Sequence, residues 1–154
     1  METLIHRRVQ QCREGSFDQA VCRVSSGWVV MGDVQILTGY CLLLPDPVVP
    51  NLNALETQKR KDFLYEMSVV GDVLLELTGA VRINYEMIGN VEPALHAHIF
   101  PRFESEPESL RLKPAWFYDW DAMEKFNLGQ QKPFILELKE GLQALNLVID
   151  TQSI

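Results

Sequence analysis

Two of the chain's three histidines lie two positions apart in an otherwise apolar run, and this run constrains the fold more than any other stretch. It covers residues 94–102 and reads ALHAHIFPR. Successive side chains of a strand point to opposite faces, so a strand here would place His96 and His98 on one face and the intervening apolar residues on the other. The two imidazoles would then lie roughly 6 to 7 Å apart along the chain. The run therefore predicts a sheet with a core on one side and a functional site on the other.

Size and composition indicate one globular domain. The chain has 154 residues, of which 47% are hydrophobic and 23% charged, values typical of an ordinary folded protein. Its formal net charge of -7 argues against a nucleic acid polymer as partner, because such binding needs clustered lysine and arginine. A nucleotide-sized ligand stays compatible with this charge, since a local pocket can hold it.

The cysteines and the N-terminus point to a cytoplasmic protein. Cys12, Cys22 and Cys41 are odd in number, lack CxxC spacing and lie in or beside apolar runs, which is typical of buried thiols in a reducing compartment. The first residues contain no apolar core of a secretory signal. No stretch approaches the roughly 18 to 20 apolar residues of a membrane span, so we expect no membrane partner.

Strand patterns recur along the first two thirds of the chain. Residues 20–24 and 28–31 are β-rich runs around a turn-forming Ser-Ser-Gly, which predicts a hairpin. Residues 40–44 form a short apolar run that ends at a proline, as in a central strand. Residues 80–87 alternate apolar and polar side chains, and the histidine run would return antiparallel to them. The polar face of this arm would then lie beside the histidine face.

A long amphipathic helix lies between these strands. Apolar residues recur at spacings of three and four, namely Phe63, Met67, Val70, Leu74 and Leu77. Asn53 is predicted as its N-cap, with Glu56 completing a capping box, and Gly79 as its C-terminal stop. Gly71 inside the stripe indicates either close contact between helix and sheet or a bend.

The two ends of the chain give weaker patterns. Residues 4–14 fit a short helix or an extended arm, and Pro133 is predicted to occupy the first turn of a final helix. Residues 114–120 are rich in aromatic side chains without a clear period, which indicates irregular structure lying over the domain. The last residues, 149–154, are expected to fray.

These elements predict an α+β fold, in which a long amphipathic helix packs on one face of an antiparallel sheet, with a further helix at the C-terminus. We divide the chain into an N-terminal arm or short helix (1–19), a core (20–105) and a C-terminal extension packed on the same domain (106–154).

Residues 94–102 resemble the motif of the histidine triad (HIT) nucleotide hydrolases and transferases, His-φ-His-φ-His-φ-φ with φ apolar, which Pro-Arg follows in many members. Setting the Pro-Arg pair of this chain on theirs makes His96 the middle histidine and His98 the last, with Ala94 at the first. A second register would make His98 the middle histidine. We prefer the first, which keeps apolar residues on all four φ positions. Upstream, Tyr40 stands where the family's Gly-His strand carries its histidine.

The resemblance implies covalent chemistry at the α-phosphate of a nucleotide conjugate. His96 would be the nucleophile and form a nucleotidyl-histidine intermediate, while His98 would hydrogen-bond the phosphate or the leaving group. The substrate classes that the family suggests are dinucleoside polyphosphates, such as diadenosine polyphosphates, and nucleoside phosphoramidates. The resemblance also implies a HIT-like sheet and a homodimer, and we expect no cofactor.

Four further residues are candidate binding residues. We expect Asn84, Asn90 and Arg102 to contact the phosphate and Trp28 to border the base. Arg102 has a simpler alternative, an ion pair with one of the glutamates that follow it. The aromatic residues Trp116, Phe117, Tyr118 and Trp120 are more typical of a packed lid or dimer contact than of a base-stacking surface.

Two other functions stay open. Ala94 in place of the first histidine favours weak activity, or a HIT-fold protein that binds a nucleotide without turnover. A His-x-His pair can also bind a metal ion in a hydrolase, but this needs a further ligand, and the only other histidine is His6.

Overall fold

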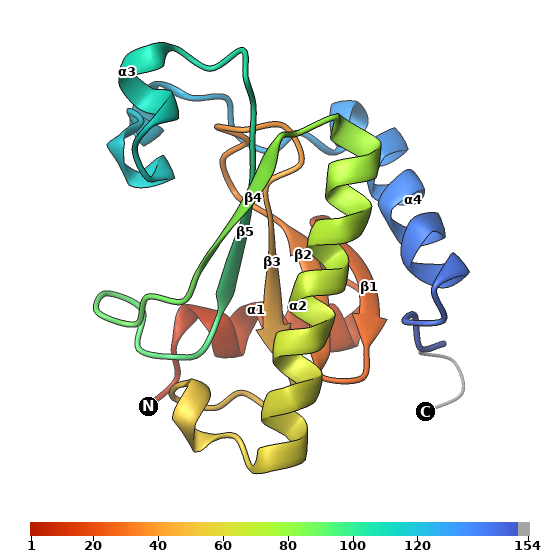
Figure 1. Ribbon diagram of the computed structural model, residues 1–154. Coiled ribbons are helices and arrows are strands. Elements are labelled where there is room, and N and C mark those ends of the chain that lie inside the picture. The colour runs from red at the N-terminus through yellow and green to blue at the C-terminus, as the bar shows by residue number, and fades with distance from the viewer. Residues whose placement is uncertain (151–154) are drawn as a thin grey trace.

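The centre of the molecule is a five-stranded antiparallel sheet with the strand order β1-β2-β3-β5-β4 (Figure 1). The structure is a computed structural model that describes residues 1–150. The strands are β1 (Ala20–Val24), β2 (Gly27–Met31), β3 (Cys41–Pro45), β4 (Arg82–Glu86) and β5 (Ala97–Arg102). The predicted α+β fold, the first hairpin and the antiparallel return of the histidine strand are all confirmed.

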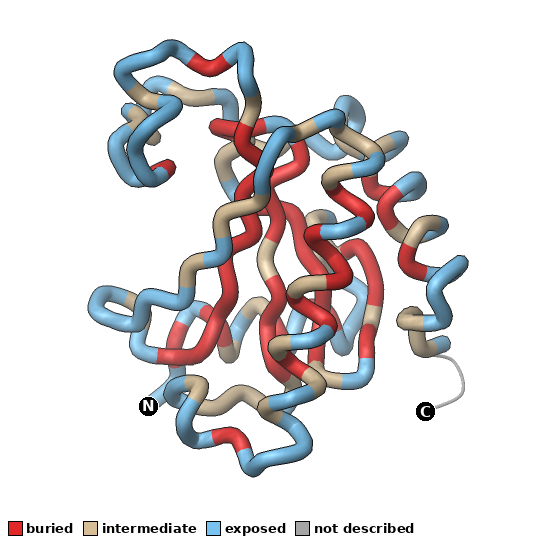
Figure 2. The backbone as a smooth tube through the Cα atoms, in the orientation of Figure 1, coloured by how far each residue is buried: buried red, intermediate tan, exposed pale blue. Residues whose placement is uncertain are grey.

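Helices cover one face of this sheet. The long helix α2 (Thr57–Thr78) and the C-terminal helix α4 (Leu128–Ala144) pack on the side chains that β2, β3 and β5 turn toward them. This layer holds the main core, in which Val29, Leu43 and Ile99 are completely buried. Figure 2 shows the same concentration of buried residues along the central strands.

The opposite face has a mixed cover. Helix α1 (Leu4–Glu14) packs on Trp28, Val30 and Leu44 in a second apolar cluster. A third cluster joins Tyr40 and Phe100 to the segment after β5. That segment contains α3 (Glu108–Arg111) and two single-turn 3₁₀ helices, η2 (Ala115–Phe117) and η3 (Trp120–Ala122).

Helix α1 settles the alternative left open for residues 4–14. Thr3 accepts a hydrogen bond from the backbone N–H of His6, and the imidazole of His6 accepts one from the backbone N–H of Thr3. This reciprocal cap begins a helix, and Gly15 ends it in the left-handed conformation.

Two predicted helix starts are wrong. Asn53 lies in the short 3₁₀ helix η1 (Leu52–Ala54), and α2 begins later because the carboxylate of Glu56 accepts from the backbone N–H of Lys59 at 2.8 Å. Helix α4 begins before Pro133, since Asn127 caps it through the N–H of Gln130 at 3.1 Å. In both cases another side chain accepts from the free N–H groups of the first turn, Glu56 in α2 and Asn127 in α4.

The hairpin of β1 and β2 is fastened to α2 by a buried carboxylate. Glu66, which is 6% exposed, accepts from the backbone N–H groups of Ser25 at 3.1 Å and Ser26 at 2.8 Å. Charge-assisted bonds of this kind are stronger than neutral ones. At the C-terminus, Ile149 donates to the carbonyl of Arg23 at 2.9 Å, so the expected fraying does not include this residue. Residues 151–154 of that prediction lie outside the described part.

No helix within residues 1–150 combines the length and the apolar character that a membrane span requires.

Gly71 provides the close contact that its place in the helix predicted. A Cβ atom there would lie 2.0 Å from the hydroxyl oxygen of Tyr85 on β4. We therefore expect Gly71→Ala to destabilise the protein by about 1 to 3 kcal/mol through overpacking, although alanine is the better helix former by about 1 kcal/mol. Urea unfolding measures the change.

Tyr85→Phe removes the nearest atom of that contact, so it should reduce the cost of Gly71→Ala in a double-mutant cycle. Gly89→Ala serves as control, because its Cβ would have only an ordinary contact at 3.9 Å. An unchanged or raised stability of Gly71→Ala would contradict the overpacking.

Candidate functional site

His98 lies in β5 and His96 immediately before this strand, both on the face of the sheet away from α2. Ala97 and Ile99, which alternate with them, belong to the core under that helix. The imidazole centroids are 4.8 Å apart, with the rings at 77° to each other. Both residues are buried, at 7% and 8% exposure. The two histidines therefore share one face, as their spacing predicted.

A cavity of about 290 Å³ lies over these histidines, between α1 and the aromatic segment 115–122. Its lining includes apolar strand residues (Val30, Leu42, Leu44), residues of α1 and the turn after it (Ile5, Arg8, Phe17), and two indoles (Trp116, Trp120). Apolar walls with a few convergent polar groups are characteristic of small-molecule sites. The only arginine or lysine in this lining is Arg8, which pairs with Asp33 at 3.1 Å.

A backbone carbonyl fixes the tautomer of the neutral His96 ring. Its Nδ1 lies 2.7 Å from the carbonyl oxygen of Ala94. A carbonyl oxygen can only accept, so Nδ1 carries the proton and Nε2 of the neutral ring carries the lone pair. His96 is thus prepared as a nucleophile or as a hydrogen-bond acceptor.

His98 lies deeper in the aromatic cluster. Its Nδ1 is 2.7 Å from the hydroxyl oxygen of Tyr40, and its ring contacts Trp116 edge-on with centroids 4.9 Å apart. Burial, together with the neighbouring His96, lowers the pKa of His98 to about 3. His98 is therefore a neutral imidazole at physiological pH.

Arg102 does not reach the cavity. Its guanidinium donates to both carboxylate oxygens of Glu106 and to Asn84 Oδ1 at 2.8 Å. It also donates to the backbone carbonyls of Lys113 at 2.7 Å and Leu110 at 3.0 Å. All five N–H groups are thereby engaged, so the ion-pair alternative holds and no donor is left for a phosphate.

The other predicted binding residues are also not gathered at the histidines. Asn84 holds Arg102, and Asn90 is exposed in the connection between β4 and β5. Trp28 packs under α1 and donates from Nε1 to Asp46 at 3.0 Å, outside the cavity lining. The hairpin residues that do line the cavity are Val30 and Met31.

The pair Trp116 and Trp120 was not predicted as part of the site. Their rings stack with centroids 4.9 Å apart, and both line the cavity. The Arg102 network holds the segment that carries them, and Tyr118 adds a hydrogen bond to Glu106 at 2.7 Å. The aromatic density after Pro114 was the available signal, but it does not reveal which face of the sheet the segment covers.

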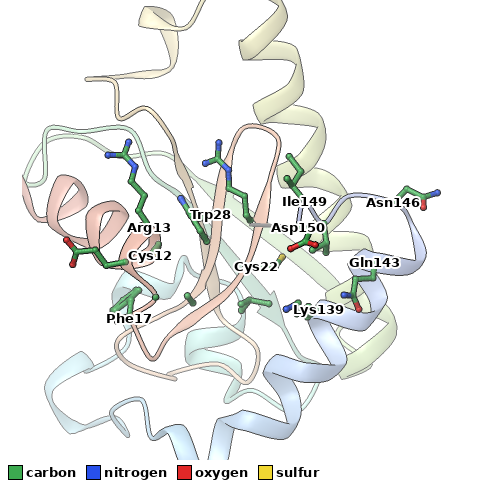
Figure 3. A pocket seen from close by; sticks show the side chains of 16 residues that line it. Cys12, Arg13, Phe17, Cys22, Trp28, Lys139, Gln143, Asn146, Ile149 and Asp150 are labelled. Atoms are coloured by element: carbon green, nitrogen blue, oxygen red, sulfur yellow. The ribbon is translucent and has the colours of Figure 1, made fainter. Parts of the chain in front are cut away.

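A larger cavity, of about 750 Å³, lies at the far edge of the sheet beside β1 and α4 (Figure 3). Arg13, Trp28 and Lys139 contribute to its lining. Burial raises the pKa of its two cysteines, Cys12 and Cys22, to about 12, so both are protonated thiols at neutral pH. Neither cysteine of this cavity is therefore present as a thiolate nucleophile at neutral pH.

The residues do not support a metal site. No group of three or more His, Cys, Asp and Glu side chains within the described residues could hold a metal ion. His6, the third histidine, caps α1. Within residues 1–150, the His-x-His pair therefore has no further ligand of the kind that a metal-dependent hydrolase needs.

Comparisons with known proteins identify the fold. No protein-family model and no curated protein sequence matches the chain. Among solved structures, a histidine triad protein from Marinobacter aquaeolei VT8 superposes with a TM-score of 0.74 and 19% identity, covering 94% of this chain and 99% of that one. A histidine triad protein from Sinorhizobium meliloti 1021 gives 0.70 and 21%, with 80% and 88% covered. A hypothetical histidine triad nucleotide-binding protein from Sulfolobus tokodaii strain7 gives 0.71 and 14%, with 91% and 93% covered. The chain therefore has the histidine triad fold.

The buried carboxylate of Glu106 makes the aromatic segment sensitive to acid. Burial alone would raise its pKa, but hydrogen bonds from Arg102, the N–H of Phe103 and Tyr118 outweigh this and lower the pKa. Its stabilising contribution is thus full above the unfolded-state pKa of about 4.3 and is lost as the pH falls through the lower folded-state pKa. We expect the fluorescence of Trp116 and Trp120 to report release of the segment below about pH 4.

The matched variants for this titration are Glu106→Gln and Glu104→Gln. Glu106→Gln should remove this acid transition, while Glu104→Gln, at an exposed neighbour, should retain it. Identical acid transitions in wild type and Glu106→Gln would show that the network does not hold the segment.

Proposed function

We propose that the protein binds a nucleotide conjugate in the cavity and that His96 attacks its α-phosphate. The observation that carries this is the bond from His96 Nδ1 to the carbonyl of Ala94, which leaves the lone pair on Nε2. The histidine triad fold supports it, and one protein of that fold is described as nucleotide-binding. The substrate classes are dinucleoside polyphosphates and nucleoside phosphoramidates.

The reaction has two steps. In the first, the Nε2 lone pair of His96 forms a bond to phosphorus, and the bond from phosphorus to the bridging oxygen or nitrogen breaks. The electron pair of that bond departs with the leaving group, and a nitrogen leaving group takes up a proton from solvent and departs as the amine. The substituted imidazole is then cationic, and the Ala94 carbonyl stabilises it through Nδ1–H. In the second, water attacks phosphorus, the N–P pair returns to Nε2, and the water proton passes to solvent. The product is a nucleoside monophosphate.

The cavity suits one nucleoside rather than two. About 290 Å³ lies at the lower end of the usual range for small-molecule sites, roughly 300 to 1,000 Å³. Val30, Leu42 and Leu44 offer an apolar surface for a base. A second nucleoside or an amine leaving group would then extend past Trp116, which is 39% exposed.

Nucleotide binding without turnover is the second candidate. It is favoured by the position of Arg102, whose donors are all engaged, so that Arg8 is the one arginine or lysine in the described lining. Charge that develops on the phosphoryl oxygens therefore lacks the cationic clamp common in phosphoryl transfer. The homodimer and the cytoplasmic location stay predictions.

Replacement of His96 separates the candidates. Wild type incubated with diadenosine tetraphosphate or adenosine phosphoramidate should release AMP and carry an AMP-sized mass adduct. His96→Ala should lose at least about 10³-fold in turnover and show no adduct. Glu104→Gln is the control, because Glu104 is exposed and lies outside the cavity lining.

Turnover that survives His96→Ala would exclude the nucleophile assignment. Binding of AMP without turnover by wild type would favour the second candidate, and turnover lost on adding chelator would favour a metal ion.

Ala94 has a structural reason to be small. It is 2% exposed and belongs to the cluster that α1 forms with the sheet. We expect Ala94→His, which restores the family residue, to lower the free energy of unfolding by about 1 to 3 kcal/mol, since the larger ring must displace α1. Urea unfolding of this variant beside Ala94→Ser measures it, and equal stabilities would show that α1 does not compete with a first histidine.

A further inference from the structure

Tyr40 has a single hydrogen-bond partner. Its hydroxyl oxygen lies 2.7 Å from His98 Nδ1, and no other bond to this hydroxyl occurs within residues 1–150. The residue is 3% exposed, and it also lines the cavity over the histidines. Among the groups of residues 1–150, His98 is therefore the one acceptor for the proton of this hydroxyl.

Because the Tyr40 hydroxyl has one protein partner, we can infer which group donates in the bond between Tyr40 and His98. If His98 Nδ1 carried a proton, the tyrosine oxygen would accept it, and the hydroxyl's own proton would have no acceptor among the described protein groups. An unsatisfied buried donor costs about 1 to 3 kcal/mol. If Tyr40 donates, both groups are satisfied. Nδ1 of the neutral His98 ring then accepts, so the ring proton is on Nε2.

The tyrosine ring is held so that its hydroxyl cannot turn to another partner. It stacks on Phe100 with centroids 4.3 Å apart and meets the edge of Trp120 at 5.8 Å. Gly32 admits the ring from the third side, because a Cβ there would lie 2.2 Å from a carbon of Tyr40. The hydroxyl position is thus set by packing.

We infer that Tyr40 is a positioning residue that fixes His98 in the tautomer with Nε2–H, so that His98 offers a neutral hydrogen-bond donor to an anionic ligand. The inference rests on the proposed function for its consequence but not for its geometry. No bond to His98 Nε2 occurs among the described side chains and backbone, and the ring lines the cavity. This nitrogen is free to meet a ligand.

The two histidines then have opposite roles because their Nδ1 atoms have opposite partners. A carbonyl accepts from His96, which leaves a lone pair on its Nε2, and a hydroxyl donates to His98, which leaves a proton on its Nε2. A phosphoryl group matches this pair, since its phosphorus accepts the lone pair and its oxygens accept the hydrogen bond. Because burial keeps His98 neutral, the donor carries no charge and transfers no proton.

The direct test is the tautomer of His98 in the ligand-free protein, read from its ¹⁵N chemical shifts at pH 7. In wild type we expect Nε2 protonated and Nδ1 unprotonated at His98, with the reverse at His96. Tyr40→Phe keeps the ring and removes the hydroxyl, so His98 should move toward the Nδ1–H tautomer. Spectra of His96→Ala and His98→Ala assign the signals.

Tyr85→Phe is the matched control, because it removes a tyrosine hydroxyl that lies against Gly71 of α2 rather than against His98. It should leave the His98 tautomer unchanged. A wild-type His98 protonated at Nδ1, or an unchanged tautomer in Tyr40→Phe, would overturn the inference whether or not the protein turns over a nucleotide. An equal shift in Tyr85→Phe would overturn it too, since the tautomer would then not depend on the hydroxyl of Tyr40.

Turnover tests the consequence separately. In a protein that releases AMP, Tyr40→Phe should lower kcat about tenfold, as expected for one hydrogen bond, with KM changed less. If wild type releases no AMP, the proposed function is contradicted, but the inference about the tautomer is unaffected. An unchanged kcat in Tyr40→Phe, with the tautomer moved, would overturn the role of the donor.

Discussion

Side chains alternate between the two faces of the sheet along β5, and both the core and the cavity depend on this alternation. Ala97 and Ile99 enter the core under α2, and His98 and Phe100 face the cavity side. A slip of one residue in the pairing with β3 would bury the histidines under the helix and expose the core residues. The apolar residues of β5 therefore stabilise the sheet and set the direction of the histidines in the same step.

Two elements from opposite ends of the chain complete the site on that face. Helix α1 rests on an apolar cluster that includes Ala94, and the aromatic segment is tied to the end of β5 by Arg102. The two histidines thus lie between Ala94, on which α1 packs, and Arg102, which holds the aromatic segment. This arrangement explains why the arginine after the histidines is buried rather than directed at a ligand.

Local pattern predicted the elements well and their partners less well. The alternation at residues 94–102 and the stripe of α2 depend on neighbours within a few positions, so they predicted strand, helix and buried face correctly. The partners of Arg102 and the place of Trp28 depend on tertiary contacts, since Glu106 and Asp46 compete for those groups once the chain is folded. The wall of Trp116 and Trp120 escaped prediction for the same reason, because irregular segments have no period that indicates a face. The predicted N-cap of α2 was wrong because Asn53 belongs to a separate 3₁₀ turn. Asn51 caps that turn, and Glu56 caps α2.

Helix α1 is 11 residues long, a length at which an isolated helix is marginal in water. Its persistence thus comes from docking on the sheet, and the docked form is the one that encloses the cavity. Docking and ligand occupancy are therefore linked equilibria: a ligand that contacts α1 binds the docked state preferentially and raises its population, and a change that loosens α1 weakens binding by the same factor. The N-terminal helix can in this way regulate affinity without touching either histidine.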